Sequence, residues 1–287
     1  MSSPRDFIDV EIPSSKPKIK EGIFFDMPNK EYHEIDGLSS TQFKLLQESI
    51  KHYENRKGLY EDEDNTEALL IGCLRHTLLL EPHLIDDYIE TTTKTFESEV
   101  TKKLIKDNPT KMIVPFGSIE LSKKIINKVR LLYSDYLDNA VKECSFIVFD
   151  ENIKLYRKCR PDIWIPHMGI IIDYKTSKET TRIGFERNSV SQFNYDLQAS
   201  WYIDTMNIVI EKFNLPYPKI KDFAWIVSPS ARPYIPFSAL AGKDIIEKGR
   251  EKYIKETNNY IEVKFNNKFD DIFKEIHTLE YYRSLNN

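Results

Sequence analysis

Two acids and one lysine stand close together in the middle of the chain. Asp162 and Asp173 are separated by eleven positions, and Lys175 follows the second acid by two. Carboxylates that lie near one another repel unless a cation sits between them, so the spacing predicts a divalent-cation site beside an amine. Oxygen donors with few nitrogens favour Mg²⁺ or Mn²⁺ over Zn²⁺, which prefers cysteine or several histidines. The alternative is a surface salt bridge at the end of a strand.

A β-hairpin would hold these side chains. The β-branched runs 163–165 and 170–172 are separated by a short segment that contains proline and glycine, a pattern typical of two paired strands in a buried sheet. Side chains alternate along a strand, so Asp173 and Lys175 should point to one face and Tyr174 to the other. The hairpin therefore predicts an acid and an amine side by side, with the second acid on the neighbouring strand.

Two upstream residues could complete such a site. His76 lies near the end of segment 66–80, which is apolar nearly all round and predicts a buried helix. Glu143 closely follows a second predicted helix, 118–141. Each residue also has a simpler interpretation. A buried histidine is more often a hydrogen-bonded core residue than a ligand, and Glu143 could be a surface acid at a helix end.

The remaining segments predict the elements of one α/β domain. After an expected arm at residues 1–21, the order is helices, a meander of three or four strands, a helix, and then more strand and helix. Strands are expected at 22–27, 145–150, 153–159, 223–229 and 234–240, and helices after the capping box of Ser39 and Gln42, over 194–213, and twice at the charged end of the chain. The acidic stretch 60–65 predicts a solvated turn. We expect residues 22–287 to form a single domain with a central mixed β-sheet flanked by helices and a helical N-terminal elaboration.

Composition describes an ordinary globular protein. Of 287 residues, 40% are hydrophobic and 30% are charged, and no apolar run is long enough to cross a membrane. The N-terminus lacks the basic-then-apolar order of a secretion signal. Cys73, Cys144 and Cys159 have no metal-site spacing, which indicates free thiols and a cytoplasmic protein. The net charge of −4 counts weakly against a nucleic-acid partner, although an enzyme can confine positive charge to one groove.

Motifs on both sides of the hairpin carry a family resemblance. The triplets Arg160-Pro161-Asp162 and Asp173-Tyr174-Lys175 resemble the short signature of the PD-(D/E)XK nuclease superfamily. Downstream, Gln198 and Tyr202 stand at i and i+4 on one helix face, similar to the Q-x-x-x-Y helix of the exonuclease branch that includes the RecB nuclease domain. Upstream, GCLRHTLLLEP around His76 is similar to the G-x-x-x-H-x-L-L-L-E-P segment of RecE-type exonucleases.

The resemblance covers most of the chain. It runs from about residue 22 to 245 and includes five separated motifs in order, among them EGIFFDMP and EYHEIDGLSSTQFKLL near the start. The chain thus resembles the C-terminal nuclease domain of RecE, exonuclease VIII. In that family the strand after the Q-x-x-x-Y helix usually ends in an acid, whereas this chain reads IVSPSARPY. Because that position is not catalytic in the pattern, we expect altered substrate handling at most.

The resemblance implies a role for each matched residue. The metal ligands would be the side chains of His76, Glu143, Asp162 and Asp173. The backbone carbonyl of Tyr174 would add a further ligand. Lys175 would orient the attacking water, and a neighbouring metal is expected to lower its pKa. Gln198 and Tyr202 would position the helix, the lysine or the scissile phosphate, although both could be polar groups facing the core. Arg182, Phe185 and Arg187 are candidates for phosphate contacts, with a solvated face an equal alternative.

The function that the resemblance implies is a metal-dependent exonuclease that digests linear double-stranded DNA from 5′ ends. It would leave a 3′ single strand for a RecT-like annealing protein, and it would act as a ring-shaped homo-oligomer in the cytoplasm of a bacterium or a phage-infected host. Two alternatives stay open. One is another nuclease of the superfamily, specific for single strands or for particular DNA structures. The other is a catalytically silent DNA-binding assembly protein, against which the intact acids and lysine argue because buried charges are costly to keep.

Overall fold

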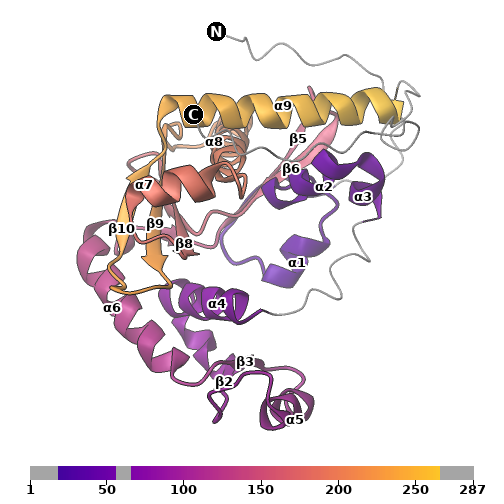
Figure 1. The fold of residues 1–287 in the computed structure, drawn as a ribbon. Helices are drawn as coiled ribbons and strands as arrows, with labels where there is room; N and C mark the ends of the chain where they lie inside the picture. Colours follow the sequence, from indigo (N-terminus) through magenta and orange to yellow (C-terminus); the bar gives the residue numbers. More distant parts are fainter. Residues whose placement is uncertain (1–18, 56–65, 266–287) are drawn as a thin grey trace, which may run out of the picture.

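The computed structural model describes residues 19–55 and 66–265 (Figure 1). Three predicted features fall outside these residues: most of the N-terminal arm, the acidic turn at 60–65, and the second of the two C-terminal helices. Within the described ranges, no helix is both long and apolar enough to span a bilayer.

A five-stranded mixed sheet forms the centre of the fold, as the sequence predicted. In spatial order its strands are β10 (Phe237–Leu240), β9 (Asp222–Pro229), β8 (Ile170–Ser177), β7 (Ile163–Ile165) and β4 (Val141–Lys142). Strands β8 and β9 are parallel, and the other neighbours are antiparallel. The strand composition explains the arrangement, because β-branched and aromatic residues fit a sheet that is covered on both faces.

The predicted hairpin is the pair β7 and β8. Its register joins Ile163 to Ile172 and Ile165 to Ile170. Gly169 closes the turn with φ of 66°, and a Cβ there would lie 2.4 Å from the carbonyl oxygen of Lys219, so the turn requires glycine. Beyond Ile172, β8 continues for five residues, and no strand of the described ranges pairs with them on the β7 side.

A second sheet corrects the prediction of one continuous meander. Strands β1 (Gly22–Phe24), β5 (Ser145–Asp150) and β6 (Leu155–Cys159) form a separate antiparallel sheet in the order β1-β5-β6. The chain leaves this sheet after Cys159 and enters the central sheet at Ile163. The three residues between them therefore bridge the two sheets.

Helices cover both faces of the central sheet. Helix α8 (Tyr195–Lys212) lies on one face with α9 (Lys243–Phe265) packed behind it, whereas α4 (Glu67–Leu80) and α6 (Ser118–Leu137) cover the other face (Figure 1). Side-chain alternation divides the core accordingly. Trp164 and Trp225 join the cluster on the α8 side, and Ile163 and Ile226 join the cluster on the α4 side.

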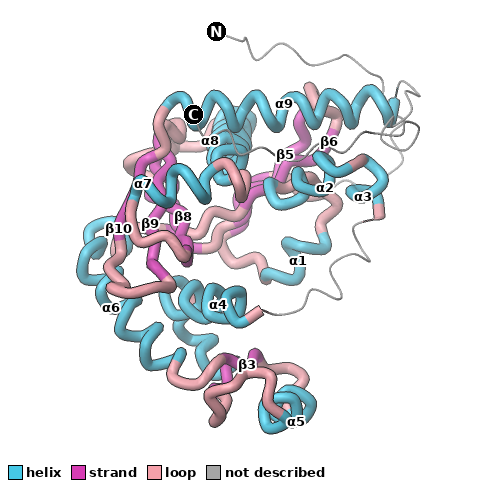
Figure 2. Tube along the Cα trace, in the orientation of Figure 1, coloured by secondary structure: helices cyan, strands magenta, loops and turns pink. Residues whose placement is uncertain are grey.

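The remaining elements can be followed in Figure 2 and include the predicted helical N-terminal part. They are α1 (Asn29–Glu34), a 3-10 turn (Ser40–Gln42), α2 (Phe43–Glu48), α3 (Ile50–Glu54), a 3-10 segment (Pro82–Asp87), β2 (Tyr88–Glu90), α5 (Glu99–Asp107), β3 (Met112–Val114), α7 (Arg182–Phe185) and a π-helical turn (Glu186–Val190). The capping pair is present, since the Ser39 N–H donates to Gln42 Oε1 at 3.0 Å.

Candidate active site

The open side of β8 creates the candidate site. Past Ile172, no strand among residues 19–55 and 66–265 pairs with the backbone of β8 on this side, and the N–H of Tyr174 donates instead to Asp162 Oδ2 at 2.7 Å. In an extended strand the N–H and C=O of one residue point to the same side. The carbonyl of Tyr174, a predicted metal ligand, is therefore directed toward the same opening as Asp162.

Glu143 reaches the opening from β4, and this corrects the prediction that it follows a long helix. Helix α6 ends at Leu137, four residues before the expected end. The short strand β4 then pairs with β7 through Val141 and Trp164, and continuing this register sets Glu143 opposite Asp162. The Glu143 N–H donates to the Asp162 carbonyl at 3.3 Å, and its φ of 53° lies in the left-handed region that is uncommon outside glycine.

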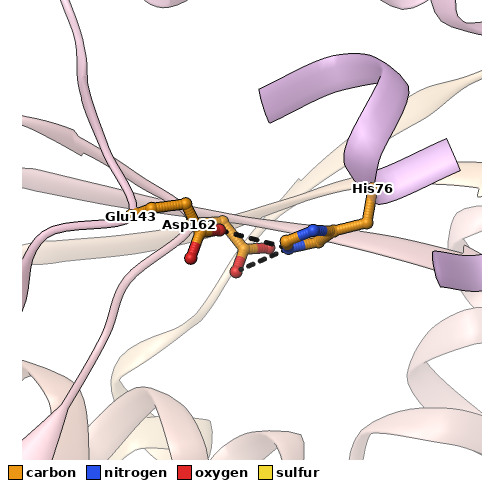
Figure 3. Close-up of side chains that lie close together, drawn as sticks. All are labelled: His76, Glu143 and Asp162. Carbon is orange, nitrogen blue, oxygen red and sulfur yellow. Dashed lines mark ion pairs between the residues drawn. The ribbon is translucent and has the colours of Figure 1, made fainter. Parts of the chain in front are cut away.

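His76 approaches the same two carboxylates from helix α4 (Figure 3). Its Nε2 lies 3.3 Å from Asp162 Oδ1 and 3.4 Å from Glu143 Oε1. Its side chain is 34% exposed, so it lines an opening and is not the fully buried residue that the apolar helix predicted. One donor atom from each of the three residues lies within 4.8 Å of the others, a separation that a single cation could bridge.

The electrostatics of this cluster are those of crowded acids. Burial raises the pKa of the Glu143 carboxyl to about 7, Asp162 adds to the rise, and His76 and Arg160 oppose it. Burial alone would lower the pKa of His76, but Asp162, Glu143 and Asp173 together raise it to about 9. The pKa of Asp162 is lowered despite burial, because His76, Lys175 and the Tyr174 N–H favour its charged form.

Asp173 and Lys175 form an ion pair beside the cluster, on the face of β8 that alternation predicted. Lys175 Nζ lies 2.7 Å from Asp173 Oδ2, and Gln198 Nε2 donates to Asp173 Oδ1 at 2.9 Å. Burial raises the pKa of Asp173 to about 6 although Lys175 opposes the rise. For Lys175, burial lowers the pKa, but Asp173 and Asp162 outweigh it and the pKa is raised. The lowering expected from a neighbouring metal ion stays a prediction, because these shifts arise from the protein's own charges.

Gln198 and Tyr202 both face the site from α8. Tyr202 is buried and hydrogen-bonds to Gln198, which in turn contacts Asp173. The structure thus brings together every residue that the sequence singled out as a ligand or catalytic group. The roles assigned to these residues remain predictions.

The donor set fits a hard divalent cation. Three carboxylates, one imidazole and one backbone carbonyl supply mostly oxygen atoms, which suits Mg²⁺ or Mn²⁺. Glu143 Oε1 is buried and makes no hydrogen bond within the described part of the chain. Its positive neighbour is the His76 imidazole at 3.4 Å, and a bound cation would replace the proton that His76 carries. Asp173 lies outside the tight group of His76, Glu143 and Asp162, but its charge acts on the pKa of His76.

Two further residues contact the predicted groups and were missed from sequence. Arg160 Nε lies 2.8 Å from Glu143 Oε2, and its Nη1 donates to the Met27 carbonyl at 2.9 Å. Its place in the R-P-D triplet could have indicated this role. The ring centroid of Tyr195 lies 4.7 Å from Lys175 Nζ, and its position three residues before Gln198 is a signal only once the helix face is known.

The candidate phosphate contacts around α7 are partly wrong. Phe185 is a core residue, 1% exposed, and packs against Trp225, so it is not available to a ligand. Arg182 is exposed and its Nε donates to the Ser238 carbonyl at 2.8 Å, which ties α7 to the edge strand β10. Arg187 is exposed and stays a candidate.

Comparison with known proteins places this geometry in a family. Residues 39–277 match the model of the PDDEXK-like domain of unknown function (DUF3799). The chain belongs to this family. Among solved structures, the fold is similar to that of a "Putative exonuclease" from Eubacterium rectale, with a TM-score of 0.56 and 16% identity over 84% of this chain and 87% of that one. A search of curated proteins finds no match. The PDDEXK-like fold that the sequence predicted is therefore confirmed, at a level broader than the RecE-type resemblance.

Proposed function

We propose that this PDDEXK-like protein is a metal-dependent exonuclease that hydrolyses phosphodiester bonds of linear double-stranded DNA. The observation that carries the proposal is the convergence of His76, Glu143 and Asp162 within 4.8 Å of one another, beside the ion pair of Asp173 and Lys175. The family match and the likeness to the Eubacterium rectale structure are consistent with it.

The residues of the chain divide the work between binding and positioning. His76, Glu143, Asp162, Asp173 and the Tyr174 carbonyl would hold Mg²⁺ or Mn²⁺. A bound divalent ion lowers the pKa of a water ligand and neutralises charge on the phosphate oxygens. Lys175 would donate to the attacking water or to the phosphate oxygen where charge develops. Gln198 holds Asp173 by its hydrogen bond at 2.9 Å, so both oxygens of that acid have defined directions.

The finer features of the proposal come from the resemblance to RecE-type exonucleases. We expect digestion from 5′ ends, a 3′ single-stranded product, and delivery of that strand to a RecT-like annealing protein in a bacterial or phage-infected cytoplasm. A ring-shaped homo-oligomer would make digestion processive. Light scattering on the purified protein tests the oligomer, since a monomer at micromolar concentration would remove the ring from the proposal.

The test of activity compares linear duplexes, labelled at either the 5′ or the 3′ end, with closed circular duplexes. With Mg²⁺ or Mn²⁺ we expect stepwise loss of label from the 5′ ends of linear duplex, intact closed circles, and no reaction in EDTA. Nicking of circles would indicate an endonuclease, and preferential digestion of unpaired strands would indicate a single-strand nuclease. Binding of duplex without cleavage under any of these ions would indicate a silent assembly protein.

A further inference from the structure

The face of α8 that meets the active site begins one turn before the Q-x-x-x-Y motif. Tyr195, Gln198 and Tyr202 follow one another at i, i+3 and i+7, which places them on a single helix face. Gln198 contacts Asp173, and Tyr202 contacts Gln198. The first residue of the series, Tyr195, contacts Lys175. One helix face thus touches both the acid and the amine of the D-x-K strand.

The contact between Lys175 and Tyr195 has the geometry of a cation–π interaction. The lysine Nζ lies 4.7 Å from the centroid of the tyrosine ring, inside the distance at which a ring attracts an ammonium group. The lysine side chain is 19% exposed, so the pair is largely shielded from water. An interaction of this kind is stronger when it is desolvated.

The ring of Tyr195 is itself held in place. It stacks on the buried ring of Phe185 at a centroid distance of 5.8 Å and an interplanar angle of 25°, and the ring of Phe193 packs on it at 5.7 Å. The segment that delivers it departs from regular helix: a π-helical turn covers Glu186–Val190, and Asn194 has a left-handed φ of 55°. Such local departures are costly and occur often at functional sites.

Lys175 has two neighbours of different kinds, and they respond differently to a metal ion. Asp173 pairs with the ammonium group at 2.7 Å, but Asp173 is also a predicted metal ligand. A carboxylate that is neutralised by a cation attracts the lysine less. The ring of Tyr195 is uncharged and is not a predicted metal ligand. It can therefore hold the lysine both with and without a bound metal ion.

We propose that Tyr195 is a positioning residue that orients the ammonium group of Lys175 through its aromatic ring. This inference rests on the proposed nuclease function for its effect on rate, but the contact itself does not. Tyr195 touches neither metal ligands nor substrate in this assignment. It acts through the lysine, and its ring is the part of the side chain that matters.

The test replaces Tyr195 without changing its size. Tyr195→Phe keeps the aromatic ring. Replacement of Tyr195 by phenylalanines that carry one, two or three ring fluorines also keeps the ring, but each fluorine withdraws electron density from its face. We expect Tyr195→Phe to keep near-wild-type kcat, each fluorine to lower kcat further over a total range of about 2- to 30-fold, and KM for duplex DNA to stay within about twofold. Two results would overturn the proposal. One is a kcat that does not change with the number of fluorines, and the other is a loss of kcat in Tyr195→Phe as large as that of the trifluorinated ring.

A matched variant controls for lost packing. Tyr217 is also half-buried and packs against Trp164 at a centroid distance of 4.8 Å, with no contact to Lys175. Tyr195→Leu should lower kcat by at least as much as the trifluorinated ring, whereas Tyr217→Leu should leave it unchanged once both proteins are shown to be folded by thermal melting. Equal losses in the two leucine variants would identify packing as the cause.

A second measurement needs neither DNA nor metal and so separates this inference from the proposed function. In protein labelled with ¹³C-lysine, the side-chain methylene next to the Lys175 ammonium should show an upfield ring-current shift, assigned by its loss in Lys175→Ala. The shift should persist in Tyr195→Phe and disappear in Tyr195→Leu. An unshifted Lys175 resonance in the wild-type protein would refute the contact. Absence of nuclease activity alongside a normal shift would refute only the proposed function.

Discussion

At the scale of single residues, the site contains a buried ion pair in which burial disfavours the charged form of the acid. Asp173 is 1% exposed and its pKa is raised to about 6 by burial. A carboxyl group in this state ionises at the expense of folding stability. A buried carboxylate of this kind is costly in a purely structural role. A bound cation would offset the cost, which is consistent with Asp173 as a metal ligand.

Substitution of either member of the pair tests the proposed mechanism. We expect Asp173→Ala and Lys175→Ala each to reduce cleavage by about 10³-fold or more. Asp173→Ala should also lower the melting temperature, because it leaves the Lys175 ammonium group without the partner that lies 2.7 Å away, so circular dichroism must show that the variant is folded at the assay temperature. The matched controls are Lys106→Ala and Asp107→Ala on the exposed end of α5, which should keep full activity. Full activity in a folded Asp173 or Lys175 variant would remove the mechanism.

Arg160 is expected to act through Glu143. Its guanidinium lies 2.8 Å from Glu143 Oε2, and a group that orients a metal ligand typically contributes about 10- to 100-fold to metal affinity. We therefore expect Arg160→Met to weaken Mn²⁺ binding by about that factor in calorimetry, with Arg160→Lys intermediate because a lysine lacks the planar fork of donors. Arg187→Met removes an exposed arginine instead and should leave the affinity unchanged. Wild-type affinity in Arg160→Met would show that Glu143 is held without it.

At the scale of elements, the position of α8 decides where Gln198 and Tyr195 point, and α9 holds α8. The two helices approach closely at Gly249, where a Cβ would lie 2.0 Å from the Asp196 carbonyl oxygen. Arg250 makes two hydrogen bonds to Asp204 beside this point, at 2.8 and 2.9 Å. The glycine is needed because no larger residue fits between the helices.

A pair of glycine substitutions tests this close approach. Gly249→Ala should destabilise the protein by about 2 kcal/mol or more, because backbone on α8 must move to admit the methyl group. Gly72→Ala on α4 should stabilise it by about 0.5–1 kcal/mol, because nothing lies within 4 Å of the added Cβ and alanine is the better helix former. Denaturant unfolding measures both. Equal effects of the two substitutions would contradict the helix packing.

Elements with strong local patterns were predicted well, and elements formed by pairing were not. The apolar run of β8 and the length of α8 follow from periodicity. Strand β4 has two residues, Val141 and Lys142, and no periodicity can indicate so short a strand. It forms because β7 offers a partner about twenty residues away in sequence, and the same pairing places Glu143 at the end of a strand, where the sequence predicted a helix end.

At the scale of the whole molecule, α4, β4, β7, β8 and α8 meet where the chain changes from one sheet to the other. Because β7 pairs with β8 only up to Ile172, the second half of β8 is open on the β7 side. His76 enters from the helix on one face of the sheet and Gln198 from the helix on the opposite face. A continuous sheet would separate these two side chains.

Metal binding at such a site should release protons. Ligands bind metals in their deprotonated forms, while the pKa of His76 is raised to about 9, that of Glu143 to about 7 and that of Asp173 to about 6. Raised values mean that protons compete with the ion, so Mn²⁺ affinity should rise steadily from about pH 5.5 to 8. Calorimetry in two buffers of different ionisation enthalpy should count about one to two protons released per ion at pH 7. Binding that is independent of pH in this range would place the ion elsewhere.

The amino-acid order alone was enough to predict the D-x-K strand, the side that Asp173 and Lys175 share, the helix of Gln198 and Tyr202, and the α/β class. These depend on alternation and periodicity, which are properties of neighbouring residues. The family resemblance predicted that His76, Glu143 and Asp162 share a site. Their distances, the support from Arg160, and the ring of Tyr195 against the lysine depended on how distant segments pair and pack. Contacts of that kind arise only when the chain folds, because sheet register and helix packing bring together residues that no local pattern relates.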